Sequence, residues 1–199
     1  MTQKKSKLSL RNGFRKIGII TKHNLKAMMP CLKMLVPELK KYEREILYDG
    51  NCCHAFGKKK GLEKSEIMRK ADMAIVLGGD GTLLKVARSV ATKKVPVLGV
   101  NMGNVGFLTE TTPKGMHGIL KKIFSGHYSI DERFLLRVTV YRNGKKYFTS
   151  LAFNDAVINQ GGFARLIQLR VEVNQRKLAL YNADGLIIST PTGSTGHSL

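Results

Sequence analysis

The sequence predicts an α/β domain built on a parallel sheet, followed by an antiparallel all-β domain. Two observations carry this prediction. Up to about residue 125, short apolar runs alternate with segments whose apolar residues recur at helical spacing. From about residue 130 onward, apolar residues alternate with polar ones, a pattern typical of half-buried strands.

In the first domain, a basic tail of about 14 residues precedes a first strand at Lys16–Ile20. Residues 25–39 then carry their apolar side chains on one helical face, but Pro30 and Pro37 conflict with one straight helix, so we expect a kink or a late start there. The remaining expected elements follow in chain order: strands at Glu45–Tyr48, Met73–Leu77 and Val95–Val100, and helices at Leu62–Lys70, Leu83–Ala91 and Met116–Phe124. Repeated strand–helix units indicate a Rossmann-like domain over residues 15–128, with helices on both faces of its sheet.

The second domain, expected over residues 129–199, consists of short strands. Apolar and polar residues alternate from Leu136 to Tyr141, and Asn143-Gly144 is a hairpin signal. Further strands are expected at Ile167–Val173 and Leu186–Ile188, followed by a polar loop at Thr190–Thr195. Because a loop so rich in hydroxyl groups and glycine usually leads into further structure, we expect this domain to be incomplete.

The composition indicates anionic partners. The 199 residues carry a formal net charge of +20, which favours nucleotides, nucleic acid or acidic surfaces. Aromatic residues make up only 7% and the basic residues are scattered, so we expect mostly solvated charge, with no specific nucleic acid as partner. No apolar stretch approaches the roughly 20 residues of a membrane span, and we expect no membrane association.

Cys31, Cys52 and Cys53 are odd in number and partly adjacent, so they do not form a disulfide framework. This cysteine usage favours a reduced, cytoplasmic protein. Cys52-Cys53-His54 lacks the paired spacing of zinc sites, and we therefore predict no protein-built metal site.

The most informative motif is Gly78-Gly79-Asp80-Gly81-Thr82, directly behind the apolar run Met73–Leu77. A buried strand here ends in a glycine turn that opens onto a helix N-terminus, where unpaired N–H groups and the positive dipole end suit a phosphate. A carboxylate beside phosphate is unfavourable unless a magnesium ion or a substrate hydroxyl lies between them. Asp80 is thus a candidate base or metal partner in phosphoryl transfer, although a plain tight turn with Asp80 near the helix N-cap would give the same pattern.

Four motifs in order resemble those of the NAD kinase family. They are Gly78-Gly79-Asp80-Gly81-Thr82, Asn101-Met102-Gly103-Asn104-Val105-Gly106-Phe107-Leu108-Thr109, the pair Asn154-Asp155, and the run from Asp184 to Thr195. The resemblance covers essentially the whole chain beyond the basic tail and agrees with the expected order of the two domains.

The resemblance implies that the γ-phosphate of ATP is transferred to the 2′-hydroxyl of the adenosine ribose of NAD, giving NADP, with Mg²⁺ or another divalent metal. Asp80 would be the catalytic base, Phe107 would pack against the adenine, and Asn154 and Asp155 would hydrogen-bond the adenosine. Asp184 would contact the nicotinamide end, with a neighbouring subunit as one source of this contact. The other residues implied in cofactor or substrate binding are Gly78, Gly79, Gly81, Thr82, Thr192, Ser194, Thr195, Gly196 and His197.

The resemblance also implies a homo-oligomer, a dimer or a tetramer. Family members continue for many tens of residues further, so the chain is expected to be truncated at its C-terminus. Gly196-His197 stand where the family commonly has Ala-Tyr, so an imidazole replaces a ring that would stack on the substrate.

Simpler interpretations of these motifs remain open at this point. Phe107 alone would suit a core, Asn154-Asp155 and Asp184-Gly185 would suit plain turns, and Thr190–Thr195 would suit a capped helix start with Pro191 at an early position. Two other functions also fit: a lipid kinase of the diacylglycerol or sphingoid type, which shares the Gly-Gly-Asp-Gly-Thr turn, and an inactive nucleotide-binding fragment.

Overall fold

The computed structural model describes residues 5–6, 13–22, 24–89, 94–103, 106–162 and 165–197, with only the backbone of Lys5, Ser6, Ser89, Thr195, Gly196 and His197. The chain forms two compact units, residues 1–132 and residues 133–199. No helix in the described ranges is both long and apolar enough to cross a membrane.

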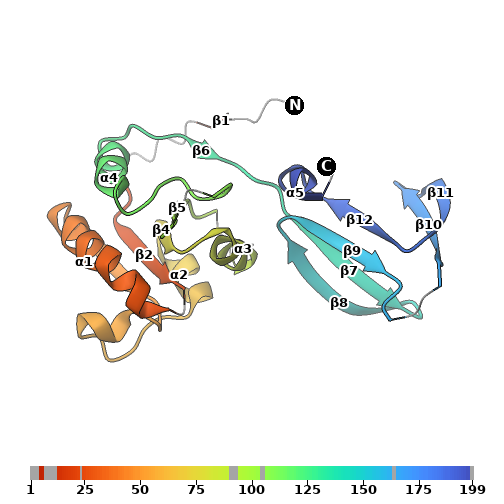
Figure 1. Cartoon of the computed structure of the whole chain (residues 1–199), viewed down its shortest axis with the longest axis horizontal. Helices are drawn as coiled ribbons and strands as arrows, with labels where there is room; N and C mark the ends of the chain where they lie inside the picture. Colours follow the sequence, from red (N-terminus) through yellow and green to blue (C-terminus); the bar gives the residue numbers. More distant parts are fainter. Residues whose placement is uncertain are drawn as a thin grey trace. The chain divides into compact units, whose positions relative to one another are not determined.

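The first unit contains a four-stranded parallel sheet in the order β3-β2-β4-β5 (Figure 1). The strands are β2 (Lys16–Thr21), β3 (Glu45–Tyr48), β4 (Met73–Leu77) and β5 (Val97–Val100). Leu77 pairs with both Thr21 and Val100, so three carboxyl ends lie at one edge of the sheet. The predicted parallel sheet is confirmed, with Val95 and Pro96 preceding β5 rather than opening it.

Helices cover both faces of this sheet. Side chains of α1 (Leu25–Lys41) and α4 (Met116–Phe124) form one buried cluster with the sheet, and those of α2 (Lys64–Lys70) and α3 (Asp80–Ser89) form the other. Because successive strand residues point to opposite faces, Ile19 joins the first cluster and Ile20 joins the second. A short 3₁₀ helix, η1 (Cys53–Phe56), follows β3.

Helix α1 is continuous over 17 residues although it contains Pro30 and Pro37. It begins at Leu25, where Asn24 Oδ1 accepts a hydrogen bond from Ala27 N at 3.3 Å, so the expected late start is wrong. Its buried residues are Met28, Cys31, Leu32, Leu35, Val36 and Leu39. An interior proline costs about 3 kcal/mol, whereas each fully buried large apolar side chain contributes about 1.5–3 kcal/mol. Burial of this face therefore outweighs the two prolines.

Part of the N-terminal segment is built into the first unit. Lys5–Ser6 (β1) pairs antiparallel with Ile130–Asp131 (β6). Phe14 is buried, with its ring centroid 5.3 Å from that of Tyr128. Residues 1–4 and 7–12 lie outside the described residues, so the flexible tail over residues 1–14 stays a prediction.

The second unit consists of three antiparallel strand pairs and one short helix. The pairs are β7 (Leu136–Arg142) with β8 (Lys145–Ala152), β9 (Asp155–Asn159) with β12 (Gly185–Ser189), and β10 (Ile167–Val173) with β11 (Arg176–Ala183); the helix is α5 (Pro191–His197). Asn143 and Gly144 have φ angles of +50° and +71°, which fits the predicted two-residue hairpin between β7 and β8.

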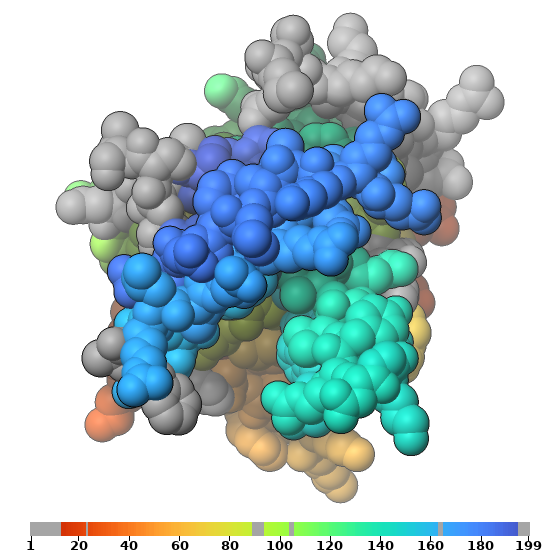
Figure 2. Space-filling view, turned by 90° about the vertical axis from the view of Figure 1, so that its right-hand side faces the viewer, coloured from red at the N-terminus to blue at the C-terminus, as the bar shows by residue number. Residues whose placement is uncertain are grey.

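Apolar side chains of the second unit lie at its surface. The buried hydrophobic residues of the described chain all belong to the first unit, whereas Tyr147 on β8 and Leu178 on β11 are 68% and 65% exposed. Figure 2 shows this surface, with the β7–β8 hairpin in teal and the later strands in blue. Within the described residues, the second unit therefore has no buried apolar core of its own.

Candidate active site

The glycine turn after β4 leads directly into α3. Gly78 N donates to Val100 O at 3.0 Å, which ties the turn to the neighbouring strand β5. Gly79 O accepts from Thr82 N at 2.9 Å and from Leu83 N at 3.3 Å, so the helical hydrogen bonds begin directly at the turn.

Helix α3 begins at Asp80, three residues earlier than the sequence predicted. Asp80, Gly81 and Thr82 therefore lie in its first turn, where backbone N–H groups have no helical acceptor. A carboxylate at this position is stabilised by the helix dipole, by about 0.3–1 kcal/mol at an exposed site. The expected helix end at residues 90–91 lies outside the described residues.

The Asp80 carboxylate is held by two consecutive backbone amides of the segment that follows β5. Phe107 N donates to Asp80 Oδ2 at 3.0 Å, and Leu108 N donates to Asp80 Oδ1 at 3.1 Å. The donors lie 27 and 28 positions after Asp80, so the first two sequence motifs meet at this one side chain.

Gly106 allows this close approach. A Cβ on residue 106 would lie 2.5 Å from Asp80 Oδ1 and 2.9 Å from its Oδ2, closer than real Cβ contacts allow. Asn104 and Val105 of the same motif lie outside the described residues.

Phe107 is 62% exposed, so the interpretation of its ring as a core side chain is wrong. Its backbone binds Asp80 while much of its ring is open to solvent. A flat apolar surface next to an anchored carboxylate suits a ligand that carries both an aromatic base and a hydroxyl group.

In the second unit, Asn154 and Asp155 lie beside the start of α5. Asp155 pairs with Ser189 in the β9–β12 register, and Asn154 O accepts from Thr190 N at 2.7 Å. A Cβ on Gly193 would collide with the Asn154 backbone, so only glycine fits this approach. Two of the predicted motifs are thus brought together here, through residue pairs more than 30 positions apart, Asn154 with Thr190 and Asp155 with Ser189.

The segment predicted as a polar loop is a helix start. Thr190 Oγ1 accepts from Gly193 N at 3.0 Å, in the manner of an N-cap, and Pro191 is the first helical residue. Ser194 Oγ donates to Pro191 O at 3.0 Å. The loop prediction is wrong and its alternative, a capped helix start with Pro191 at an early position, is confirmed; hydroxyl residues and proline are common both in loops and at helix starts. The side chains of Thr195 and His197 lie outside the described atoms.

Arg133 is a neighbour of this motif that the sequence did not indicate. Its Nη1 donates to Thr192 Oγ1 at 3.3 Å, and Thr192 is 9% exposed. The two residues are 59 positions apart, and only a predicted contact between the start of the second unit and α5 could have joined them.

Asp184 is not brought to the Asn154-Asp155 end of the β9–β12 pair. It precedes Gly185, which pairs with Asn159, and its carbonyl accepts from Gln160 N at 3.1 Å. Ser189 lies at the opposite end of β12, and a strand rises about 3.3 Å per residue. Asp184 thus lies about a strand's length from the cluster formed by Asn154, Asp155 and Thr190.

The three cysteines lie inside the first unit, away from solvent. Cys31, Cys52 and Cys53 are buried and not disulfide-bonded. Burial raises the pKa of the Cys31 thiol to about 11; burial, followed by the nearby charge of Asp49, raises the pKa of Cys52. Among the described residues, no group of three or more His, Cys, Asp and Glu side chains could hold a metal ion.

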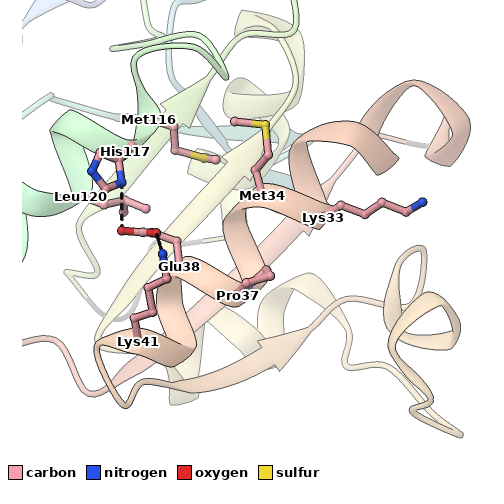
Figure 3. Close-up of a pocket in the computed structure, with 8 residues that line it drawn as sticks. All are labelled: Lys33, Met34, Pro37, Glu38, Lys41, Met116, His117 and Leu120. Carbon is pink, nitrogen blue, oxygen red and sulfur yellow. Dashed lines mark hydrogen bonds and ion pairs between the residues drawn. The ribbon is translucent and has the colours of Figure 1, made fainter.

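A groove of about 280 Å³ between α1 and α4 is lined by none of the predicted site residues (Figure 3). Its floor is apolar, and Glu38 lies within it between Lys41 and His117. This groove is separate from the motifs that meet at Asp80.

Two family models match the chain: the ATP-NAD kinase N-terminal domain over residues 17–128 and the ATP-NAD kinase C-terminal domain over residues 153–199. The first alone covers more than half of the 199 residues. The chain belongs to the ATP-NAD kinase family, which confirms the resemblance predicted from its four motifs. The lipid-kinase alternative finds no support in these matches.

Individual relatives agree with the family. The NAD kinase of Geobacter sulfurreducens is 46% identical over 153 residues, which are 77% of this chain and 54% of that protein. The NAD kinase of Burkholderia pseudomallei is 36% identical over 188 residues, which are 94% of this chain and 63% of that protein. The chain thus spans about half to two thirds of the length of these relatives.

A crystal structure of yeast NADH kinase complexed with NADH has the same fold. It matches with a TM-score of 0.84 at 21% sequence identity, over 99% of this chain and 63% of the yeast chain. The predicted order, a parallel α/β domain followed by antiparallel strands, is confirmed.

Proposed function

We propose that this protein is an NAD kinase, which transfers the γ-phosphate of ATP to the 2′-hydroxyl of the adenosine ribose of NAD and forms NADP. The observation that carries this proposal is the Asp80 carboxylate, fixed at the start of α3 by the amides of Phe107 and Leu108. Family membership supplies the reaction, and this geometry supplies a group able to perform the proton transfer.

Asp80 acts as the general base. Each of its oxygens accepts one amide hydrogen bond and keeps further lone-pair capacity, so it can also accept a hydrogen bond from the ribose hydroxyl. Taking the hydroxyl proton makes the oxygen a stronger nucleophile toward the γ-phosphorus. A positioned base of this kind contributes about 10²–10⁴ in rate.

The glycine turn binds phosphate. The glycine backbone at Gly78, Gly79, Gly81 and Thr82, at the N-terminus of α3, supports a close approach of phosphate oxygens to the main chain and to the positive end of the helix dipole. Mg²⁺ enters as the MgATP complex, since Mg²⁺ commonly keeps water and phosphate ligands and needs few protein carboxylates.

The remaining predicted contacts concern NAD. The exposed ring of Phe107 supports packing against adenine, and the juxtaposition of Asn154, Asp155 and Thr190 supports a hydrogen-bonding cluster for the adenosine. Further NAD contacts are assigned to Thr192, Ser194, Thr195, Gly196 and His197. Asp184, at the opposite end of the strand pair, is assigned to the nicotinamide end, with a neighbouring subunit as one source of this contact.

The protein works as a homo-oligomer, a dimer or a tetramer, in the cytoplasm. The exposed apolar strand faces of the second unit support an assembly that covers them. The three buried thiols, none in a disulfide, support a reducing compartment.

The test is an assay of the protein expressed from its complete reading frame, incubated with NAD, ATP and Mg²⁺. We expect NADP, detected with an NADP-specific dehydrogenase and identified chromatographically as the 2′-phosphate. Phosphorylation of a lipid acceptor, or of a different hydroxyl of NAD, would contradict the proposal. The same assay with the 199-residue chain measures how much activity these residues carry.

A further inference from the structure

We propose that Thr109 is a positioning residue for the phosphoryl transfer, because its hydroxyl oxygen holds the turn whose amides orient Asp80. This inference rests on the proposed role of Asp80 as base and adds a residue to which the sequence motifs gave no role. Thr109 acts through the backbone and itself contacts no reacting atom in this assignment.

The hydrogen bond that Thr109 makes is short and partly buried. Its Oγ1 accepts from Gly106 N at 2.6 Å, and the residue is only 4% exposed. The next two amides along the chain, those of Phe107 and Leu108, are the two that donate to the Asp80 carboxylate. Three consecutive N–H groups are thus fixed by two side chains, one of which is the candidate base.

Thr109 also stands where this turn joins the rigid sheet. Glu110 N donates to Gly99 O on β5 at 3.0 Å, and Thr111 forms a parallel bridge with Val100 at the end of β5. The chain is therefore held on the sheet at residues 110 and 111. The Thr109 hydroxyl transmits that anchoring to Gly106 at the far side of the turn.

Loss of the Thr109 hydroxyl removes the acceptor of the hydrogen bond from Gly106 N. Valine has nearly the shape of threonine and would fill the same buried space, but it leaves Gly106 N without this acceptor. The turn then relaxes toward water, and the amides of Phe107 and Leu108 move away from Asp80. A residue that only filled space would tolerate valine.

The experiment compares Thr109→Val, Thr109→Ser and the control Thr111→Val in the complete protein. Thr111 is also a buried threonine of this segment, but its hydroxyl donates to the adjacent Thr112 O and not toward Asp80. We expect Thr109→Val to lower kcat for NADP formation about ten- to a hundred-fold, as displacement of a reacting group does. Thr109→Ser recovers most of the rate, and Thr111→Val keeps it.

A second readout is independent of activity. In the 199-residue chain, amide NMR signals and hydrogen-exchange protection of Phe107 and Leu108 report their bonds to Asp80. Thr109→Val should shift these signals and reduce the protection, as Asp80→Ala does, whereas Thr111→Val should not.

The kinetic and NMR measurements distinguish failure of the proposed role of Thr109 from failure of the proposed function. If Thr109→Val retains wild-type kcat, or leaves both amide signals and their protection unchanged, the role of Thr109 is overturned while the proposed function stands. If even the wild-type protein forms no NADP, the proposed function fails, and the NMR comparison still decides whether Thr109 orients Asp80.

Discussion

At the scale of single residues, the site depends on a contact between Asp80 and the backbone of residues 106–108. The sequence predicted roles for both Asp80 and Phe107: Asp80 stands in a glycine turn before a helix, and the role of Phe107 follows from the resemblance of its segment to the NAD kinase family. It could not show that the backbone amides of Phe107 and Leu108 donate to the Asp80 carboxylate. Backbone donors are invisible in a sequence, since every residue except proline carries the same N–H group.

Gly106→Ala tests this contact. The added methyl group would lie 2.5 Å from Asp80 Oδ1, so the carboxylate has to move. We expect kcat for NADP formation to fall about ten- to a hundred-fold, with the fold retained. The matched control is Gly103→Ala in the same segment, where a Cβ meets nothing within 4 Å. Equal activity of the two variants would show that the Asp80 position is unimportant.

At the scale of elements, α1 and α4 are linked by a contact between Glu38 and His117, two side chains that line their groove (Figure 3). Glu38 on α1 contacts Lys41 Nζ at 3.1 Å and His117 Nδ1 on α4 at 3.0 Å. The hydrogen bond from Lys41, and then the charges of Lys41 and His117, hold the pKa of the Glu38 carboxyl below its usual value.

Glu38→Gln should therefore change the pH dependence of stability. A carboxyl whose pKa is lowered by folding stabilises the native state above its unfolded pKa of about 4.3, and that stabilisation is lost as the pH falls through the lower folded value. We expect the variant to be less stable than wild type at pH 7 and equal to it once Glu38 is protonated. Denaturant unfolding of wild type and variant at pH 7 and at an acidic pH where Glu38 is protonated measures the two stability differences. A stability difference that is the same at the two pH values would refute the prediction.

The elements of the first unit could be predicted because each strand and helix shows its own periodicity. The errors occurred where distant residues decide the outcome. Helix α1 runs through Pro30 because its buried face packs on the sheet, and α5 forms where Thr190 and Gly193 meet Asn154. The packing of α1 on the sheet overrides local propensity and leaves no local signal, whereas the start of α5 has one, the capped helix start that stood as the alternative to a loop.

At the scale of the whole molecule, the two units differ in how their apolar residues are buried. The first unit encloses two clusters on its sheet, whereas the second exposes apolar side chains on all three strand pairs. The chain spans 54% of one NAD kinase relative and 63% of another. We therefore expect the assembled protein to cover strand faces that this chain leaves open.

Light scattering coupled to size-exclusion chromatography tests this expectation. The protein from the complete reading frame should elute as a dimer or tetramer that binds little hydrophobic dye. The 199-residue chain should bind the dye strongly through side chains such as Tyr147 and Leu178. A monomeric complete protein, or a 199-residue chain that binds no dye, would contradict the assembly proposed for the second unit.

The most direct test of the central claim is the rate of NADP formation by Asp80→Asn. The amide keeps nearly the size of the carboxylate but cannot accept the ribose proton. We predict that kcat falls by about 10²–10⁴ while the variant still binds NAD. Undiminished NADP formation by Asp80→Asn would show that Asp80 is not the base.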